Sequence, residues 1–357
     1  MQAPSEEIPP PGLLFDLSLG ESIDGVLALA LLYGASDGKG AKVRLASVSI
    51  SRPDLGAAGF AEALGGFYSD IANREIPERF RRRRSLPVGL RDGSPSPTPP
   101  MLAVPLAEKN AEGEPLYANE IHEINDTAEV PALIRNALTA YHDQNCMVAL
   151  AGPASDLADV LEVSGAKDWI ETKSRFLAVA MGSFDGSSGT DPHVAADIAA
   201  AQKVFEHWPA PIIAVGREIG DAISFPSPDE YAAKLTWTER HPVLDAYRAS
   251  GVSNPKTWAM ATALYAAFPE EGYFKLSEPG VISIGSDGRA AFHPGGHGRH
   301  RHLIFDPEQK QRIADAYLEL ASAEPAPREL PGFLKRIIEE QKAKEAEEAA
   351  KKEQPSK

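Results

Sequence analysis

Apolar runs alternate with helical patterns along most of the chain. Strand-like runs, rich in Val, Ile, Leu or Ala with little polar alternation, occur at 12–16, 42–50, 146–152, 175–182 and 210–216. Helical patterns occupy stretches between them, at 24–33, 55–72, 130–142, 155–163 and 194–207. Strands covered on both faces carry continuous apolar runs, and strands that alternate with helices form parallel sheets. The pattern therefore predicts an α/β fold with a doubly wound, mostly parallel central sheet and helices on both faces.

Three further segments set the expected domain organisation. Residues 92–117 are rich in proline, which predicts an extended surface connection within one domain. Residues 281–304 have the pattern of a Gly-rich β-hairpin, and the tail from 326 carries its charges in alternating blocks. We expect a flexible segment at 1–11, one domain at 12–325 and a charged helical or disordered tail at 326–357.

Composition restricts the classes of partner. The chain has 51 Asp and Glu against 36 Lys and Arg, a net charge of −15, which opposes binding to nucleic acid. No run approaches the ~18 apolar residues of a membrane span, so we expect no membrane partner. The single cysteine, Cys146, excludes an internal disulfide. The first residues lack the pattern of a signal peptide, so a cytoplasmic protein is the default expectation, with a periplasmic or secreted mature chain as the alternative.

Candidate site residues follow the predicted strands, because ligands of such sheets bind beyond the carboxyl ends of the strands. The first loop carries Asp16 and Asp24. Two carboxylates there can bind a cation or sugar hydroxyls; alternatively, Ser22 or Asp24 caps the next helix. The Gly- and Ser-rich loop after the fourth of these strands carries Asp191 and His193, and a long polar loop at this edge is expected to contact substrate.

Two basic clusters have simpler interpretations. The predicted hairpin holds His293, His297, His300 and His302. Histidine-rich tracts can bind zinc, but this spacing fits no rigid helical pair, and a flexible surface hairpin is favoured. The run of arginines at 80–85 is interpreted as a solvated turn rather than an anion site.

Five stretches, in order from about residue 12 to about residue 322, resemble the inosine/uridine-preferring nucleoside hydrolase family. The first stretch, "LLFDLSLGESIDG", is similar to the family's opening Asp-x-Asp-Pro-Gly-x-Asp-Asp, and the second, "LASVSISRPDLGAAGFAEAL", to its second strand and helix. The third, "ALAGPASDLADVL", is similar to its Gly-Pro-Leu-Thr-Asn turn, and the fourth, "VAMGSFDGSSGTDPHVAADIAAAQKVFEHWPAPI", to its Met-Gly-Gly loop and substrate segment. The fifth, "NPKTWAMATALYAAFPEEGYF", is similar to its late helix. The resemblance implies hydrolysis of N-glycosidic bonds of ribonucleosides, with calcium held by Asp carboxylates and one main-chain carbonyl.

The resemblance assigns the family's metal positions to residues of this chain. Asp16 matches the first Asp and Asp24 the third, so these would be the catalytic carboxylates of an active enzyme. Ser155 matches the residue whose main-chain carbonyl binds calcium, and Asp24 and the inserted Glu21 are the carboxylates left as metal ligands. Three other side-chain ligand positions hold residues without a carboxylate: Ser18, Gly25 and Ala259.

The resemblance also assigns substrate contacts. Arg52 stands in place of a ribose-contacting Asn, Asp191 and His193 in place of a Glu and an Asn, and Trp258 aligns in the late helix. Calcium takes six to eight oxygens, and a cation at Arg52 opposes a divalent ion. We therefore expect no calcium cofactor and a lost metal site.

Three functional interpretations remain open on the sequence. In the first, the chain is a non-catalytic protein that binds a nucleoside or sugar, or acts as a scaffold. In the second, it is an active N-glycosidase with a rearranged or metal-independent carboxylate site, and Arg52 binds an anionic substrate such as a ribose phosphate. In the third, it is a binding module of another α/β family, which a different sheet order would establish. The resemblance also leaves a homodimer or a homotetramer open.

Overall fold

The central feature of the protein is one long, mostly parallel sheet. The computed structural model describes residues 9–37, 41–77, 86–186, 190–328 and 332–352, so the arginine run at 80–85 lies outside the described residues. The strand order is β3-β2-β1-β4-β5-β6-β10-β8-β9, with β7 paired to β10. The strands are β1 (Gly12–Leu17), β2 (Arg44–Ile50), β3 (Val88–Leu90), β4 (Cys146–Ala151), β5 (Ser174–Val179), β6 (Ile212–Ala214), β7 (Lys275–Leu276), β8 (Gly280–Ile284), β9 (Ala290–Pro294) and β10 (His300–Ile304).

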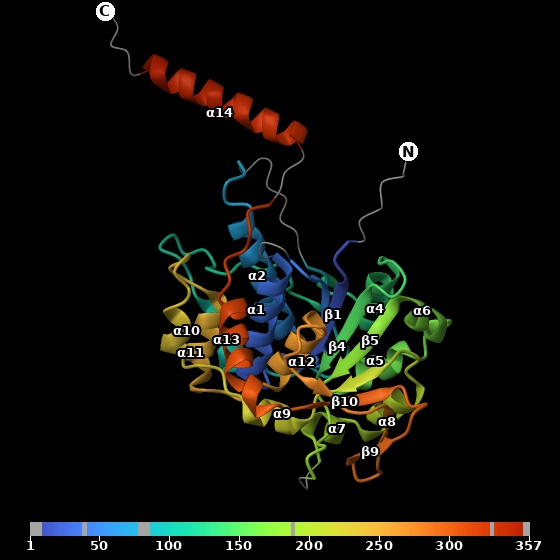
Figure 1. The fold of residues 1–357 in the computed structure, drawn as a ribbon. Coiled ribbons are helices and arrows are strands. Elements are labelled where there is room, and N and C mark those ends of the chain that lie inside the picture. The colour runs from blue at the N-terminus through green and yellow to red at the C-terminus, as the bar shows by residue number, and fades with distance from the viewer. Residues whose placement is uncertain (1–8, 38–40, 78–85, 187–189, 329–331, 353–357) are drawn as a thin grey trace, which may run out of the picture.

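Helices cover both faces of this sheet (Figure 1). They are α1 (Ile23–Asp37), α2 (Leu55–Ala72), α3 (Pro100–Ala107), α4 (Val130–Thr139), α5 (Ser155–Val160), α6 (Ala166–Lys173), α7 (Pro192–Ala196), α8 (Ile198–His207), α9 (Arg217–Ala222), α10 (Pro228–Ala232), α11 (Pro242–Ser250), α12 (Trp258–Ala267), α13 (Lys310–Ala321) and α14 (Gly332–Lys352), with 3₁₀ turns at Ile124–Asp126 and Pro307–Gln309. The predicted doubly wound fold is confirmed.

Two hydrophobic cores lie on opposite sides of the sheet. Phe15 and Leu17 of β1 pack with α1, α2, α12 and α13, whereas Leu14 packs with α4, α5 and α8. Successive side chains of a strand point to opposite faces. Asp16 therefore shares the face of Leu14 and points toward the side on which α5 lies.

The strand order places a crevice between β1 and β4. These strands are adjacent and parallel, but β1 leads into α1 on one face and β4 into α5 on the other. Chain connections that diverge in this way leave a crevice at the carboxyl ends of the strands, and ligands of doubly wound sheets bind there. The loops that carry the candidate residues start at this edge.

The structure differs from the expected elements in three places. Within 92–117, which was expected to be extended, α3 forms with Pro100 in its first turn, where proline is tolerated, and buries Leu102. The predicted helix at 194–207 is broken, because Asp197 ends α7 and caps α8. Only β8 and β9 form the hairpin predicted at 281–304, whereas β10 joins β6 in parallel.

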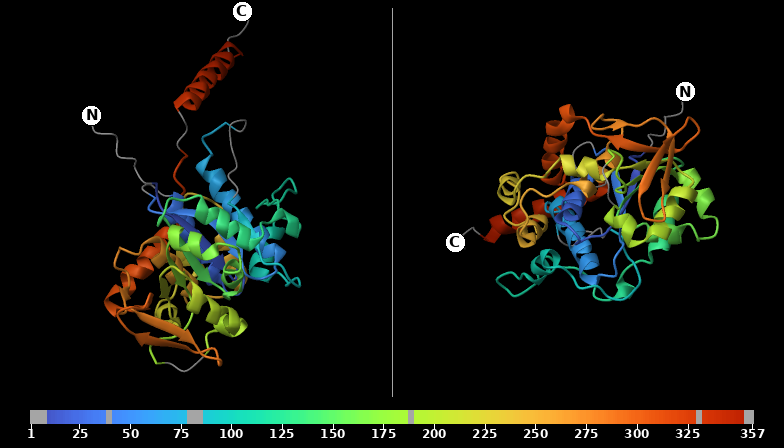
Figure 2. Two further views of the ribbon diagram at one scale, coloured as in Figure 1. Left: turned by 90° about the vertical axis from the view of Figure 1, so that its right-hand side faces the viewer. Right: turned by 90° about the horizontal axis from the view of Figure 1, so that it is seen from below.

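The tail carries α14, which extends away from the rest of the fold (Figures 1 and 2). Among the described residues, no helix is both long enough and apolar enough to cross a membrane.

Candidate functional site at the carboxyl ends of the strands

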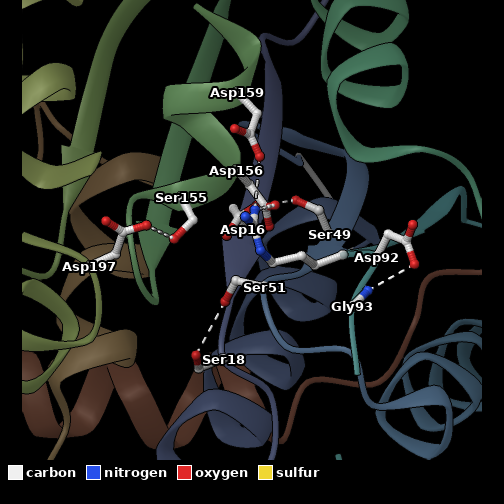
Figure 3. A network of polar contacts seen from close by, with 11 residues as sticks. Asp16, Ser18, Ser49, Ser51, Asp92, Gly93, Ser155, Asp156, Asp159 and Asp197 are labelled. Carbon is white, nitrogen blue, oxygen red and sulfur yellow. Dashed lines mark hydrogen bonds and ion pairs between the residues drawn. The ribbon is translucent and has the colours of Figure 1, made fainter. Parts of the chain in front are cut away.

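The loops after β1, β2 and β4 meet at the crevice. The Ser18 and Ser51 hydroxyl oxygens lie 3.2 Å apart, and both residues are buried (Figure 3). A Cβ atom at Gly152 would lie 2.4 Å from the Ser51 hydroxyl oxygen and 2.8 Å from the Ser18 backbone nitrogen. Glycine is therefore required at 152 for the three loops to approach. Ser18, one of the positions without a carboxylate, thus joins the loops after β1 and β2 through a contact between two hydroxyl groups.

Asp16 belongs to a buried pair of carboxyl groups. Its Oδ2 accepts a hydrogen bond of 2.6 Å from the hydroxyl of Ser49, the residue opposite it on β2. Asp156, in the first turn of α5, accepts a hydrogen bond of 2.6 Å from Arg91. The second oxygen of each carboxyl group is buried without a donor among the described residues. Figure 3 shows the two groups next to each other.

The proximity of these two carboxyl groups controls their protonation. Burial and the negative charge of Asp156 raise the pKa of Asp16 well above its ordinary value, although the Ser49 hydrogen bond opposes this rise. Burial also raises the pKa of Asp156, against the opposing effect of Arg91. Two carboxyl groups in such contact cannot both ionise easily. Asp16, which is only 1% exposed, is therefore the member of the pair that binds a proton more tightly than an ordinary aspartate.

Asp24 caps the start of α12. Its Oδ2 accepts a hydrogen bond of 2.6 Å from the backbone N–H of Ala259, and its Oδ1 accepts one of 3.1 Å from that of Met260. These N–H groups lie in the first turn of α12, where a helix has no internal acceptors, and Thr257 supplies no side-chain cap. Burial raises the pKa of Asp24 to about 7, although both N–H groups oppose the rise. Asp24 thus ties α1 to α12.

A second group of polar side chains at the same edge is more exposed. The Glu21 carboxylate lies 3.6 Å from Nε2 of His193, and these side chains are 46% and 21% exposed. The contact with His193 lowers the pKa of Glu21 despite partial burial. Burial disfavours the charged form of His193, but Glu21 and Asp191 outweigh burial and raise its pKa. Asp191 itself is buried and caps α7 by accepting from the backbone N–H groups of His193 and Val194.

Two arginines flank this group. Arg52 is half-buried just beyond β2, and its charge helps to lower the pKa of Glu21. Arg217 begins α9, lies with its guanidinium carbon 5.1 Å from the centre of the Trp258 ring, and opposes the rise in the pKa of Asp191. Trp258 donates its indole N–H to the Arg217 carbonyl at 3.2 Å. In the part of the chain that the structure describes, neither guanidinium has a carboxylate within ion-pair distance.

These residues do not fit calcium. Both oxygens of Asp24 are held by α12, and the residues at the three other side-chain ligand positions carry no carboxylate. The Ser155 hydroxyl donates a hydrogen bond of 2.7 Å to Asp197, and Asp197 also caps α8 (Figure 3). Within the described ranges, no group of three or more His, Cys, Asp or Glu residues is arranged to hold a metal ion. Calcium takes six to eight oxygen ligands, and the described residues of this edge do not bring a group of carboxylates together to supply them.

The histidines of the tract at 293–302 have different partners and do not converge on one point. His293 contacts the Ser283 hydroxyl at 3.0 Å, the Nδ1 atom of His300 accepts from the Ile282 N–H at 2.9 Å, and the His302 ring stacks on Phe184. These contacts direct the rings into different surroundings. Zinc binding therefore has no support from the geometry.

Three residues at the crevice were not identified as site residues from the sequence. Arg91 follows the three-residue strand β3, which is too short to give a pattern, and Arg217 follows β6. Asp156 lies three residues after the Gly-Pro turn at the end of β4, in the first turn of α5. That position at the carboxyl edge is the one signal in the sequence that points to it.

Comparison with known proteins gives no sequence match: no protein-family model and no curated protein matches the chain. Solved structures do match. The inosine-uridine preferring nucleoside hydrolase from Bacillus anthracis superimposes with a TM-score of 0.61 at 17% identity, over 88% of this chain and 99% of that chain. The purine-preferring ribonucleoside hydrolase from Gardnerella vaginalis gives a TM-score of 0.60 at 13% identity, over 87% and 98% of the two chains.

A further match is the type III effector protein XopQ complexed with adenosine diphosphate ribose. It gives a TM-score of 0.57 at 15% identity, over 89% of this chain and 96% of that chain. The matched structures are two nucleoside hydrolases and an effector protein. At such low identities they establish architecture, and the resemblance predicted from five sequence stretches is confirmed at that level: this chain has the nucleoside hydrolase fold.

Proposed function

We propose that this chain binds a ribose-containing small molecule at the carboxyl edge of its sheet and does not hydrolyse it through calcium. The hydrogen bonds of Asp24 carry this proposal. Its two carboxylate oxygens accept from the N–H groups of Ala259 and Met260. Each of these oxygens therefore uses one of its two lone pairs on the first turn of α12, and Ala259 brings no carboxylate of its own.

The exposed polar groups of the edge supply the binding chemistry. Glu21 can accept hydrogen bonds from ribose hydroxyls, and a protonated His193 can donate to a ring or hydroxyl oxygen. Trp258, half-buried beneath Arg217, offers an apolar surface next to them. Arg52, which has no carboxylate partner among the described residues, provides a site for an anionic group such as a phosphate. The adenosine diphosphate ribose complexed with XopQ is one molecule that combines ribose with phosphates.

The second candidate is a metal-independent N-glycosidase. Burial raises the pKa of Asp191, and His193 beside it holds a proton more tightly than an ordinary histidine. A carboxylate and a proton donor in contact are the groups that glycosidic cleavage needs. Against this, Asp16 and Asp24 are each 1% exposed, and Asp191 is 6% exposed and bonded to α7. A substrate sugar would not reach these carboxylates without movement of the loops.

Isothermal titration of the chelator-treated full chain with ADP-ribose, inosine and ribose 5-phosphate tests the proposal. We expect binding of at least one phosphorylated ribose compound that Arg52→Gln weakens and that added calcium leaves unchanged. Arg44→Gln is the matched control, because Arg44 is exposed at the opposite end of the same strand, β2.

Two outcomes would contradict the proposal. The first is that none of the three compounds binds at millimolar concentration, which would favour a scaffold. The second is release of free base from inosine, followed by chromatography, that requires added calcium; release in the presence of chelator would instead establish the second candidate, the metal-independent glycosidase.

A further inference from the structure

A groove of about 790 Å³ lies away from the carboxyl edge. It is bordered by the end of α8, by β8 and by the segment that enters β10. His300 at the start of β10 pairs with Ile212 at the start of β6, so the groove lies beside the amino-terminal starts of these strands. The site described above lies beyond the carboxyl ends of the strands. Figure 2 shows the β8–β9 hairpin at the periphery of the fold.

The groove has the size and the apolar surface of a small-molecule site. Pockets for small ligands usually measure roughly 300–1,000 Å³ and are lined mainly by apolar and aromatic side chains. Phe205, Trp208 and Ile282 are buried in its wall. Val281 lines it as well and is 50% exposed, so an apolar side chain is left in contact with water.

The charge of the lining is opposite to that of the whole chain. The net charge of the protein is −15, but among the described residues Glu206 is the only acidic one that lines the groove. The cationic residues of the lining are Lys167 and Arg299, and three histidines, His207, His297 and His300, line it as well; burial lowers the pKa of His300, so that ring adds no charge near neutral pH. Glu206 lies 4.0 Å from His207 and Arg299 contacts Glu171, whereas Lys167 has no ion-pair partner within the described ranges. The groove therefore favours an anion.

Two ring N–H groups in the wall lack an acceptor in the part of the chain that the structure describes. His300 accepts from the Ile282 N–H through Nδ1, and burial lowers its pKa, so the neutral ring carries its proton on Nε2. The buried indole nitrogen of Trp208 has no hydrogen-bond partner among the same residues. The Trp208 N–H is enclosed by protein atoms, so the His300 Nε2–H is the ring donor left for an acceptor supplied from outside the protein.

We propose that this groove is a second binding site, specific for small organic anions with an apolar, preferably aromatic, body and a carboxylate head. The apolar body lies against Phe205, Trp208 and Val281. The carboxylate accepts a hydrogen bond from the Nε2–H group of His300 and is held by the Lys167 ammonium group.

Titration of the full chain with 1-naphthoate, by calorimetry at neutral pH and moderate salt, tests the proposal. The neutral 1-naphthalenemethanol keeps the aromatic body and removes the charge. Lys167→Glu reverses an exposed charge of the lining, and Val281→Asp places a carboxylate on the apolar wall. Lys42→Glu is the matched control, because Lys42 is exposed and lies outside the lining.

We expect one-site binding of 1-naphthoate that Lys167→Glu and Val281→Asp each weaken by about tenfold or more, since a like charge then faces the carboxylate. Lys42→Glu should leave the affinity within about twofold, and the alcohol should bind at least about tenfold more weakly. Equal affinity for the acid and the alcohol would overturn the proposal. So would the absence of saturable binding, or equal losses in Lys167→Glu and Lys42→Glu.

Discussion

The substitution Asp24→Asn separates two effects of Asp24 on stability, the hydrogen bonds that it accepts from α12 and the cost of ionising a buried carboxyl group. The carboxyl group accepts from the backbone N–H groups of Ala259 and Met260 in either protonation state. The asparagine amide keeps one acceptor oxygen and turns an NH₂ group toward the other N–H. One buried donor is then left without a partner, at a cost of about 1–3 kcal/mol.

The pKa of Asp24 gives the pH dependence of this difference. Burial raises it from its ordinary value of 3.8 to about 7. The stability that such a group contributes to the native protein is fully present below pH 3.8, where the carboxyl group is protonated in both the folded and the unfolded state. This stability is lost as the pH rises toward 7. A rise of roughly three pH units, at ~1.4 kcal/mol each, lowers the unfolding free energy of the native protein by about 4 kcal/mol. The asparagine variant does not undergo this loss.

Asp24→Asn should therefore be less stable than the native protein at pH 4 and equally or more stable at pH 8. Urea denaturation of both proteins across this range, in chelator and followed by circular dichroism, measures the crossing. Asp221→Asn, at an exposed aspartate in α9, is the control and should show no crossing. A deficit of Asp24→Asn that stays constant across the range would refute the reasoning, and so would a deficit that appears only when calcium is added.

Three other predictions concern the same edge. The free energy of unfolding of Asp16→Asn should rise relative to that of the native protein between pH 5 and pH 8. The reason is that the raised pKa of Asp16 makes the native protein lose stability as pH rises, whereas the variant does not. Identical urea denaturation curves across this range would contradict this prediction. Gly152→Ala should lower the free energy of unfolding by about 1–3 kcal/mol, measured as a lower Tm, because the added methyl group overpacks the contact between the loops. Gly295→Ala, where the methyl group enters open space, is the control and should leave the Tm unchanged; equal Tm values for the two variants would contradict the prediction. Glu21→Gln should lower the pKa of His193, followed by NMR of its ring protons, and an unmoved titration midpoint would show that the pair does not interact in solution.

The parallel core of the fold was predictable from hydrophobic pattern. The runs that became β1, β2, β4, β5 and β6 are apolar on both faces, and the helix at 55–72 was predicted with the bounds of α2. Strand β3 was missed because its three residues give no periodicity. Helix α3 is not evident from the sequence because its segment, 92–117, is rich in proline, which favours an extended chain. Proline is nevertheless tolerated in the first turn of a helix, where Pro100 lies.

The site was predictable only in part, because its decisive contacts join distant segments. The sequence indicates that carboxylates are missing at Ser18, Gly25 and Ala259. It does not indicate that Asp24 bonds to the backbone of a helix 235 residues further along the chain. Nor does it reveal the Asp16–Asp156 pair, which depends on the register of neighbouring strands and on the direction of α5.

Calorimetric titration of chelator-treated protein with calcium, followed by an inosine and uridine hydrolysis assay on the same sample, tests the central claim most directly. The account predicts no calcium binding and no release of hypoxanthine or uracil, because both oxygens of Asp24 bond to α12 and no carboxylate stands at Ser18, Gly25 or Ala259. Tight binding of one calcium ion together with base release would contradict it, and would mean that Asp24 leaves α12 to serve as a metal ligand.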